Sequence, residues 1–559
     1  MANRSRRSPL TVIALSFCWL STSVTRADDA PPPAKVQVGV VIQEPQASQG
    51  YTLVFPLLST NTYLLDMHGR VVHTWASKYQ PGQEAYLLED GHLLRPAKVS
   101  DDEARFAGAG GGGRVQEFTW DGELVWDYKF HDERKTQHHA ITRMPNGNVL
   151  LIVWERKSAE ESIESGVNPA AAASGEILVD ALYEVRPQGK EGGEIVWEWH
   201  VWDHLVQDHD QGNANYGKVA EHPELIDANF ARGAGFAALF NSLSPLPPQE
   251  DSKPATGATA NKQDESLDKL KSLGYVGTGE GGKNFAGFLP DWTHVNSVAY
   301  NAELDQIMLS SRTFSEIWVI DHGTTTAEAA GHTGGRRGKG GDLLYRWGNP
   351  HAYDSGKKRE QQLFSQHDAH WIPAGLPGAG HILIFSNGGR SDGNYSSVEE
   401  IELPVDGQGN YSLGSARSYG PAKPTWTYLA EKKRDFFAAY MAGAQRLPNG
   451  DTLICTGFTG SIFEVTPEGK TVWKFINPDK GETASKKGPN FGPPGAGRAA
   501  PPALGPIAAW IGGPNAGGAL FRAYRYAPEY AGLAGRDLSL IHISEPTRLR
   551  RISYAVFCL

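Results

Sequence analysis

Apolar and polar residues alternate along most of the chain, and the alternation recurs as one hairpin pattern. A turn, usually with glycine, is followed by a strand that carries two aromatic-type residues spaced by one position. The pattern occurs in six segments: HGRVVHTW (68–75), DGELVWDY (121–128), GGEIVWEW (192–199), GGDLLYRW (340–347), KPTWTY (423–428) and EGKTVWKF (468–475). Alternation with period two next to a glycine turn is typical of a β-hairpin.

A second strand–turn–strand pattern precedes each hairpin from the second copy on. Clear examples are TRMPNGNVLLIV (142–153) and QRLPNGDTLICTG (445–457), whereas the first copy has only GYTLVFPLL (50–58) before it. Each unit therefore holds about four strands. Such a sheet has two apolar faces, and stacking against neighbouring sheets covers both. The sequence predicts an all-β fold, a six-bladed β-propeller, with the hairpin aromatics packed between blades.

Segments outside the repeat indicate further regions. Residues 1–27 have a basic start, a short apolar stretch and a small-x-small cleavage pattern, which is typical of a secretory signal peptide. Part of the 200–290 insertion has the composition of a flexible linker. We expect a signal peptide at 1–27, blades 1–3 at 50–199, a partly disordered insertion at 200–290, blades 4–6 at 291–478, a Gly/Pro-rich linker at 479–520, a C-terminal docking segment at 521–537, and at 538–559 a tail that resembles translated adapter sequence.

Charge and composition limit the partners and the location. The formal charge of −10 argues against a nucleic-acid partner, and no segment after the signal is apolar enough to span a membrane. With the signal peptide, this predicts a periplasmic or extracellular protein. Cys455 is the one cysteine between signal and tail, so no internal disulfide is expected. The Asp and His residues of DHLVQDHDQ (203–211) match no specific metal motif, and we predict a surface loop, no metal and no cofactor.

Three histidines share one offset from the turn that follows them. They are His139, His294 and His367, each six residues before the turn position at 145, 300 or 373. Equal offsets in equivalent strands put these side chains at equivalent places on different blades, and the first strand of a blade lines the central channel. We therefore expect the three imidazoles to converge at one mouth of the channel. His370, three residues after His367, is a further candidate for the same site.

A loop arginine adds a possible anion ligand. Arg390 follows two glycines in SNGGRSDGNY (386–395), where a ligand can approach the backbone closely. Guanidinium suits sulfate or phosphate because it offers forked donors and stays charged. Histidines and an arginine at a channel mouth predict an oxyanion ligand.

These motifs resemble the arylsulfotransferase family of exported bacterial proteins, the kind that needs no nucleotide sulfate donor. The resemblance is carried, in the expected order, by WTHVNSVAYNAELDQIMLSSR (292–312), QHDAHW (366–371) and ILIFSNGGRSDG (382–393), and it covers about 50–475 without the insertion. It implies a six-bladed propeller with a funnel-like site. It also implies transfer of a sulfuryl group from an aryl sulfate to a phenol through a sulfated histidine. His294, His367 and Arg390 would hold the sulfuryl oxygens and the bridging oxygen.

The resemblance leaves the nucleophile open. The family's sulfated histidine is expected in a later blade, but residues 425–450 contain no histidine. Ala442 stands at the offset from the turn at which the other blades have an imidazole. The family's disulfide cannot form either. His367 or His370 could serve, with Asp368 or Tyr440 as partner, and direct transfer between two bound substrates is another route. The predicted site comprises catalytic residues His294, His367, His370 and Arg390 and substrate-binding residues His139, Asn296 and Tyr440.

We therefore predict an exported aryl-sulfate sulfotransferase-like enzyme whose partners are a small aryl sulfate and a phenol. The absent histidine and the long insertion favour an alternative, a non-catalytic anion-binding or scaffold propeller. A hydrolase or lyase that uses the same pocket, with or without calcium, is a third reading.

Overall fold

The computed structural model describes residues 38–100, 110–172, 175–232, 291–414, 417–478 and 518–539. The predicted signal peptide at 1–27, most of the linker at 479–520 and nearly all of the tail at 538–559 lie outside these residues, as does the insertion from 233 onward. No helix within the described ranges has the length and apolarity needed to cross a bilayer.

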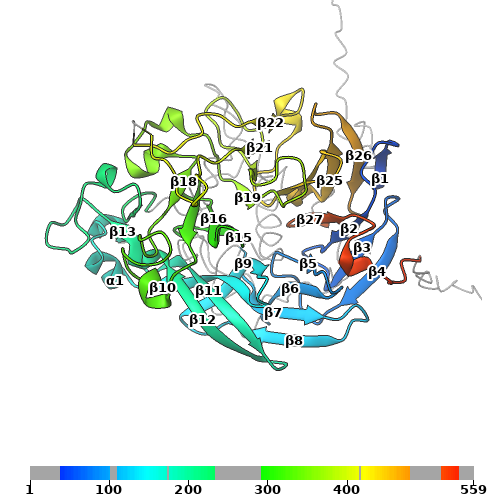
Figure 1. The fold of residues 1–559 in the computed structure, drawn as a ribbon, viewed down its shortest axis with the longest axis horizontal. Coiled ribbons are helices and arrows are strands. Elements are labelled where there is room, and N and C mark those ends of the chain that lie inside the picture. Colours follow the sequence, from blue (N-terminus) through cyan, green and yellow to red (C-terminus); the bar gives the residue numbers. More distant parts are fainter. Residues whose placement is uncertain are drawn as a thin grey trace, which may run out of the picture. The chain divides into compact units, whose positions relative to one another are not determined.

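The first three blades are antiparallel four-stranded sheets arranged around a common centre (Figure 1). Blade 1 has the order β27 (Ala523–Tyr526), β2 (Tyr51–Val54), β3 (Asn61–Leu65) and β4 (Val71–Ala76). Blade 2 comprises β5 (Tyr86–Leu87), β6 (Leu93–Lys98), β7 (Gly113–Phe118) and β8 (Leu124–Lys129). Blade 3 comprises β9 (Lys135–Arg143), β10 (Val149–Lys157), β11 (Ile177–Gln188) and β12 (Gly192–His200).

The other three blades complete the ring and confirm the predicted six-bladed β-propeller. Blade 4 comprises β15 (Val295–Asn301), β16 (Gln306–Ser311), β17 (Glu316–Asp321) and β18 (Tyr345–Trp347). Blade 5 comprises β19 (His367–Trp371), β20 (Ile382–Ser386), β21 (Ser397–Ile401) and β22 (Trp426–Tyr428). Blade 6 comprises β23 (Gly443–Arg446), β24 (Thr452–Thr456), β25 (Ser461–Val465), β26 (Thr471–Ile476) and, at its outer edge, β1 (Gly39–Gln43).

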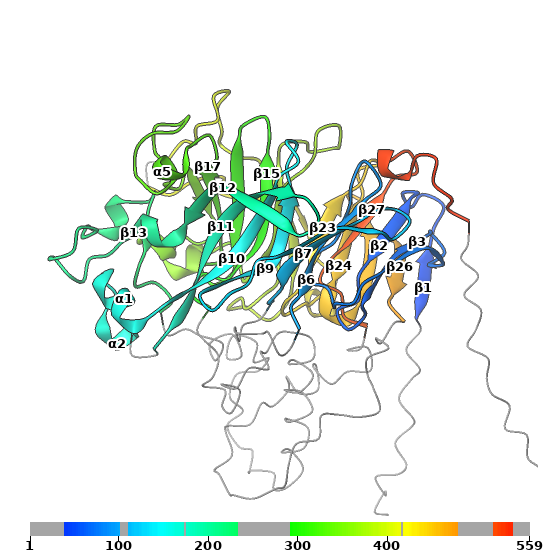
Figure 2. The same cartoon turned by 90° about the horizontal axis from the view of Figure 1, so that it is seen from below.

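Short helices and a two-stranded sheet decorate the loops, as the side view shows (Figure 2). The α-helices are α1 (Ala159–Glu164), α2 (Pro169–Ala172) and α5 (Thr326–Ala329), and β13 (Leu205–Val206) pairs with β14 (Ile226–Asp227). The 3₁₀ helices are η2 (Val201–His204), η3 (Val219–Glu221), η5 (Pro350–Tyr353), η6 (Lys358–Glu360), η7 (Lys433–Asp435), η8 (Gly457–Thr459) and η10 (Ala531–Leu533).

Both ends of the described chain take part in closing the ring. The sequence shows only one strand before the first hairpin, and β27 from the C-terminal side supplies the missing inner strand by pairing with β2. At the N-terminal side, β1 pairs with β26 and extends blade 6. Because β1 and β27 pair with strands far away in sequence, they tie the first blade to the last.

The repeated aromatics join the blades as the hairpin pattern predicts. In each blade a tryptophan of the outermost core strand donates its indole N–H to a backbone carbonyl of the next blade around the ring. The pairs are Trp75 with Thr119, Trp126 with Gly192, Trp199 with Gly341, Trp347 with Pro421, Trp426 with Pro467 and Trp473 with Met67. Between each pair of neighbouring blades lies an apolar cluster. Burial of the ring and satisfaction of its N–H together fix the spacing between blades.

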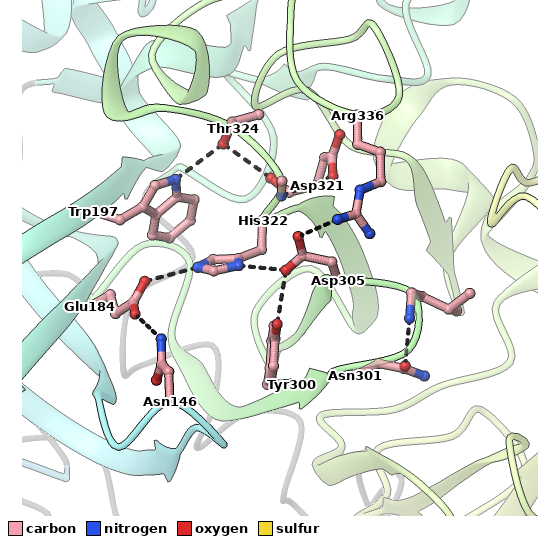
Figure 3. A network of polar contacts seen from close by, with 12 residues as sticks. Asn146, Glu184, Trp197, Tyr300, Asn301, Asp305, Asp321, His322, Thr324 and Arg336 are labelled. Atoms are coloured by element: carbon pink, nitrogen blue, oxygen red, sulfur yellow. Dashed lines mark hydrogen bonds and ion pairs between the residues drawn. The ribbon is translucent and has the colours of Figure 1, made fainter.

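A polar network adds a second connection between blades 3 and 4 (Figure 3). His322, which follows β17, lies between two carboxylates: its Nε2 is 2.9 Å from Glu184 of β11, and its Nδ1 is 2.7 Å from Asp305. Burial alone would lower the pKa of His322, but the two carboxylates raise it above its ordinary value. The same contacts lower the pKa of Glu184 and Asp305 against the opposing effect of burial. The two carboxylates thus favour the charged form of His322, which links the two blades.

Candidate functional site

Several blades carry one residue in the left-handed backbone region within the inner strand or directly before it. This residue is His139 in blade 3 (φ 49°), His294 in blade 4 (φ 47°) and Asp368 in blade 5 (φ 57°). Non-glycine residues adopt this conformation only where the surrounding structure imposes it. This backbone conformation recurs in successive blades. The inner strands β5, β9, β15, β19 and β27 surround the centre of the ring (Figure 1).

The structure brings His139, His294 and His367 together. The rings of His139 and His294 have centroids 4.8 Å apart. The ring of Phe521, just before β27, lies 5.8 Å from His139 and 6.0 Å from His367. All three histidines are buried; Phe521 of the C-terminal segment lies beside two of them, and His294 lies beside His139.

The environment of His367 fixes its proton. Asn387 donates from its amide nitrogen to the carbonyl of Ala438 (2.8 Å), which orients its Oδ1 toward Nδ1 of His367 at 2.7 Å. Since an amide oxygen can only accept, Nδ1 carries the hydrogen and Nε2 presents its lone pair. Burial and then the positive charge of Arg312 hold the pKa of His367 well below its ordinary value, although the bond to Asn387 opposes this. These effects favour the neutral form of the ring, in which Nε2 carries a lone pair and no hydrogen.

His139 belongs to a chain of buried polar groups that the sequence did not single out. Its Nδ1 lies 2.8 Å from Nδ1 of His138, and Nε2 of His138 lies 2.7 Å from Asp180. His138 also stacks on Trp154, with ring centroids 4.0 Å apart. Burial, followed by the neighbouring imidazoles, holds the pKa of His139 well below its ordinary value. The pair of histidines in QHHAIT was visible in the sequence, but Asp180 lies on another strand and gave no signal.

His294 and Asn296 connect blade 4 to its neighbours. Nδ1 of His294 lies 2.6 Å from Asp291, whose second oxygen accepts from Trp154 of blade 3 (3.1 Å). Asn296 donates to the carbonyl of Gln366 (2.7 Å), the residue before His367. The Oδ1 of Asn296 is buried and has no hydrogen-bond partner among the described residues. An unsatisfied buried acceptor is costly, so this oxygen is suited to receive a donor from a ligand.

Two buried arginines, neither singled out from the sequence, supply positive charge to the cluster. Arg312 follows β16, its backbone N–H donates to the carbonyl of His294 (3.1 Å), and its charge acts on His367. Arg522, just before β27, donates to the carbonyl of Asn296 (2.9 Å) and lowers the pKa of both His139 and His367. Two guanidinium charges thus act on the imidazoles of the cluster.

Arg522 is itself held by two carboxylates. Its Nη1 is 2.5 Å from Glu84 at the start of blade 2 and 3.3 Å from Asp368. Burial raises the pKa of Glu84 to about 7, and Arg522 opposes that rise. The C-terminal segment therefore joins blades 1, 2, 4 and 5 through one guanidinium at the centre of the ring.

The contacts of Arg390 within the described residues are made inside blade 5. Its guanidinium donates to Ser397 (2.6 Å) and to the carbonyl of Tyr395 (2.8 Å), and lies 3.3 Å from Glu399. The guanidinium carbon Cζ of Arg390 lies 4.7 Å from the centre of the Phe364 ring and 4.7 Å from that of the Tyr395 ring. The bonds that Arg390 makes to described residues stay within the blade 5 segment 386–399, and none reaches the three histidines.

The remaining predicted residues lie beside the cluster. Nδ1 of His370 is 2.9 Å from the carbonyl of Asp368, and although burial lowers the pKa of His370, the Asp368 carboxylate raises it above the ordinary value. Burial raises the pKa of Tyr440, whose ring packs 5.2 Å from Phe458. Ala442 packs in the apolar cluster between blades 5 and 6. The residue of blade 6 with the left-handed backbone is Met441 (φ 53°), so a thioether stands where blades 3 and 4 carry imidazoles.

Comparisons with solved structures give low similarity. A protein of unknown function from Bacteroides caccae has a TM-score of 0.36 and 10% identity, covering 77% of this chain and 94% of the other. Virginiamycin B lyase from Staphylococcus aureus has a TM-score of 0.31 and 7% identity, covering 78% and 87%. These scores are too low to carry an argument about function.

Comparisons of sequence identify the family. The arylsulfate sulfotransferase AssT of Lelliottia amnigena is 29% identical over 185 residues, which span 31% of this chain and 29% of that protein. The match therefore spans less than a third of that relative. The model of the family described as arylsulfotransferase (ASST) matches residues 54–486, most of the described propeller. The chain belongs to the arylsulfotransferase family.

Proposed function

We propose that this protein is an exported aryl sulfotransferase that moves a sulfuryl group from an aryl sulfate to a phenol, with His367 as the nucleophile. The observation that carries the proposal is the fixed tautomer of His367. Asn387 holds the proton on Nδ1, and Nε2 has no hydrogen-bond partner in the part of the chain that the structure describes. A neutral, buried imidazole with one available lone pair is an activated nitrogen nucleophile.

The two half-reactions balance without a cofactor. In the first, the Nε2 lone pair of His367 attacks the sulfur, the bond from sulfur to the aryl oxygen breaks, and the phenolate leaves with the electron pair. In the second, the oxygen of the acceptor phenol attacks the sulfur, the nitrogen–sulfur bond breaks, and the phenolic proton passes to a base. The first phenolate takes a proton from the same base or from water. Free His367 is regenerated.

The arginines of the cluster suit the negative charge of the sulfuryl oxygens. A sulfuryl transfer resembles a phosphoryl transfer in needing position and charge stabilisation more than covalent help. Arg312 and Arg522 both lie close enough to His367 to lower its pKa, and their charge would stabilise the sulfuryl oxygens. His139 and His294, with rings 4.8 Å apart, are neighbours that would help to hold those oxygens. Oδ1 of Asn296, which has no hydrogen-bond partner among the described residues, would accept a hydrogen bond from the phenolic hydroxyl.

His370 is the proposed base for the phenol. Its raised pKa, maintained by Asp368, lets it exchange protons near neutral pH, where a general base is most effective. In contrast, the lowered pKa of His367 keeps that ring unprotonated for attack. Two imidazoles on one strand would thus take different roles because their surroundings push their pKa values apart.

Steady-state turnover of a chromogenic aryl sulfate, with and without a phenol, tests the proposal. We expect phenol-dependent release of the chromophore from the purified protein and from the control variant His68→Ala, whose side chain is exposed. His367→Ala should lose the activity. Binding of the aryl sulfate without any turnover would instead support the non-catalytic anion-binding propeller. Release that is independent of phenol would support a hydrolase.

A further inference from the structure

We propose that His204, His332 and Asp342 bind one divalent transition-metal ion, with zinc as the first candidate, between the outer strands of blades 3 and 4. His204 ends η2, directly after the outer strand of blade 3. His332 and Asp342 lie in the connection from β17 to β18 of blade 4. This site is separate from the histidine cluster of the channel, and the inference does not depend on the proposed function.

The three side chains offer a compact set of ligand atoms. One carboxylate oxygen of Asp342 lies 2.8 Å from Nδ1 of His204 and 2.8 Å from Nδ1 of His332. One ligand atom from each residue lies within 4.8 Å of the other two. Two imidazole nitrogens and one carboxylate form a donor set that zinc and related ions bind, with the remaining positions left for water.

The second nitrogen of His204 strengthens the argument. Nε2 of His204 lies 2.9 Å from the carbonyl of Ala329, and a carbonyl can only accept. Nε2 therefore carries a hydrogen, and in the neutral ring Nδ1 presents its lone pair to the Asp342 carboxylate. Two acceptors at 2.8 Å repel each other unless a proton or a metal ion lies between them. A metal ion from solution would replace the proton there, and an N–H bonded to a backbone carbonyl is the usual support of a metal-binding histidine.

The buried side of the site is rigid. Trp199 stacks on His204 with an interplanar angle of 10°, and its indole N–H donates to the carbonyl of Gly341 (2.7 Å). A Cβ on Gly341 would lie 2.0 Å from the carbonyl oxygen of Ala329 and 2.7 Å from Nε2 of His204. The backbone next to Asp342 therefore tolerates no larger residue, which keeps two ligands in place before any ion arrives.

The third ligand makes the site accessible. The side chain of His332 is 57% exposed, whereas those of His204 and Asp342 are 0% and 8% exposed. An ion can enter from the solvent side and complete its coordination with water. Once bound, it would fasten the segment after blade 3 to the long β17–β18 connection, and closing such loops is a way in which metals stabilise a fold.

Another group, Asp90, His92 and Glu117, is a poorer metal site. It offers a single imidazole, with Nδ1 of His92 at 2.7 Å from Glu117. Arg143 lies 3.3 Å from the other oxygen of Glu117 and already neutralises part of its charge. A nearby guanidinium opposes the entry of a second cation, so this group serves as an internal comparison.

Zinc titration of the metal-stripped full-length protein by calorimetry tests the proposal. We expect one zinc ion per chain, affinity weakened at least tenfold in His332→Ala, and no change in His68→Ala or His92→Ala. His332→Ala should fold normally because the side chain is mostly exposed, and circular dichroism verifies this. Cobalt(II) should give visible d–d bands that disappear in the same variant. No stoichiometric zinc in the wild type, binding unchanged in His332→Ala, or binding lost in His92→Ala would overturn the proposal.

Discussion

Nδ1 of His367 lies 2.7 Å from Oδ1 of Asn387, and this contact decides which nitrogen of the ring is available for chemistry. Asn387 cannot reverse its amide without losing its bond to the carbonyl of Ala438. The proton therefore stays on Nδ1, and the lone pair stays on Nε2. A positioning residue of this kind should affect the pH dependence of the reaction as well as its rate.

Replacing Asn387 with aspartate should shift the acid limb of the pH–rate profile upward. The carboxylate would still accept from Nδ1, but its negative charge would raise the pKa of His367, which the native site holds low. His367 would then be protonated over more of the neutral range, and kcat/KM would fall as pH decreases from neutrality. Asn387→Leu, which removes the acceptor, should lower kcat at all pH values. A profile of Asn387→Asp superimposable on that of the wild type would contradict the assigned tautomer.

Arg312→Met should lower kcat/KM for an aryl sulfate by about 10²–10³, the range typical for loss of one preorganised donor to a developing anion. Arg312→Lys should retain part of the activity because a positive charge remains. The matched comparison is Arg390→Met, since Arg390 bonds within blade 5 and makes no described contact with the histidines. A larger loss in Arg390→Met than in Arg312→Met would restore the role that the sequence predicts for Arg390. Steady-state kinetics of the three variants decides between these outcomes.

His322 should make stability depend on pH. The pKa of His322 in the folded protein is above the ordinary 6.5, so its stabilising contribution is complete below about pH 6.5 and is lost as pH rises through the raised value. Glu184 and Asp305 have lowered pKa values, so their contributions are present above the ordinary 4.5 and 3.8 and are lost as pH falls. The link between blades 3 and 4 is therefore strongest between these limits.

Thermal unfolding of the wild type and of His322→Gln measures this effect. The wild type should exceed the variant by about 1–2 kcal/mol near pH 5.5, with the difference shrinking toward pH 9. His68→Gln, at an exposed position, provides the control. A difference in stability that stays constant from pH 5.5 to pH 9 would show that His322 is not an imidazolium in the folded protein.

Arg522→Met should destabilise the fold by about 3–5 kcal/mol because it leaves Glu84 and Asp368 buried near each other without their cation. The double variant Arg522→Met/Glu84→Gln should recover part of this loss, since it removes one of the two unpaired charges. Denaturant unfolding measures both values. Equal stability of the single variant and the wild type would mean that Arg522 does not hold the centre of the ring.

The architecture was predictable because each blade repeats the same local pattern. Alternation and glycine turns predict the hairpins, and six copies predict the ring, which the sheet topology confirms. The sequence indicated a docking segment at 521–537, but not that β27 would become the inner strand of blade 1 or that β1 would extend blade 6. Both strands are short, and their partners lie at the other end of the described chain, so the local sequence carries no signal of the pairing.

Only the site residues that occupy repeated positions in the blades could be predicted from the sequence. The shared offset of His139, His294 and His367 placed these residues on equivalent strands. In the structure His294 lies beside His139, and Phe521 lies beside both His139 and His367. Arg312 and Arg522 were missed because they follow or precede strands at positions that the repeat does not mark. In the sequence, their positive charge did not distinguish these two residues from the other arginines. Their importance depends on burial and on distances across blades, which only the folded ring supplies.

The most direct test of the account is to locate the transferred group after reaction with an aryl sulfate in the absence of a phenol. Rapid acid-free quenching and peptide mass spectrometry should find one sulfuryl group on the peptide that contains His367, and addition of a phenol before quenching should remove it. His367→Ala should carry none. A sulfuryl group on another residue, or full transfer activity with no modified peptide, would contradict the assignment of His367 as the nucleophile.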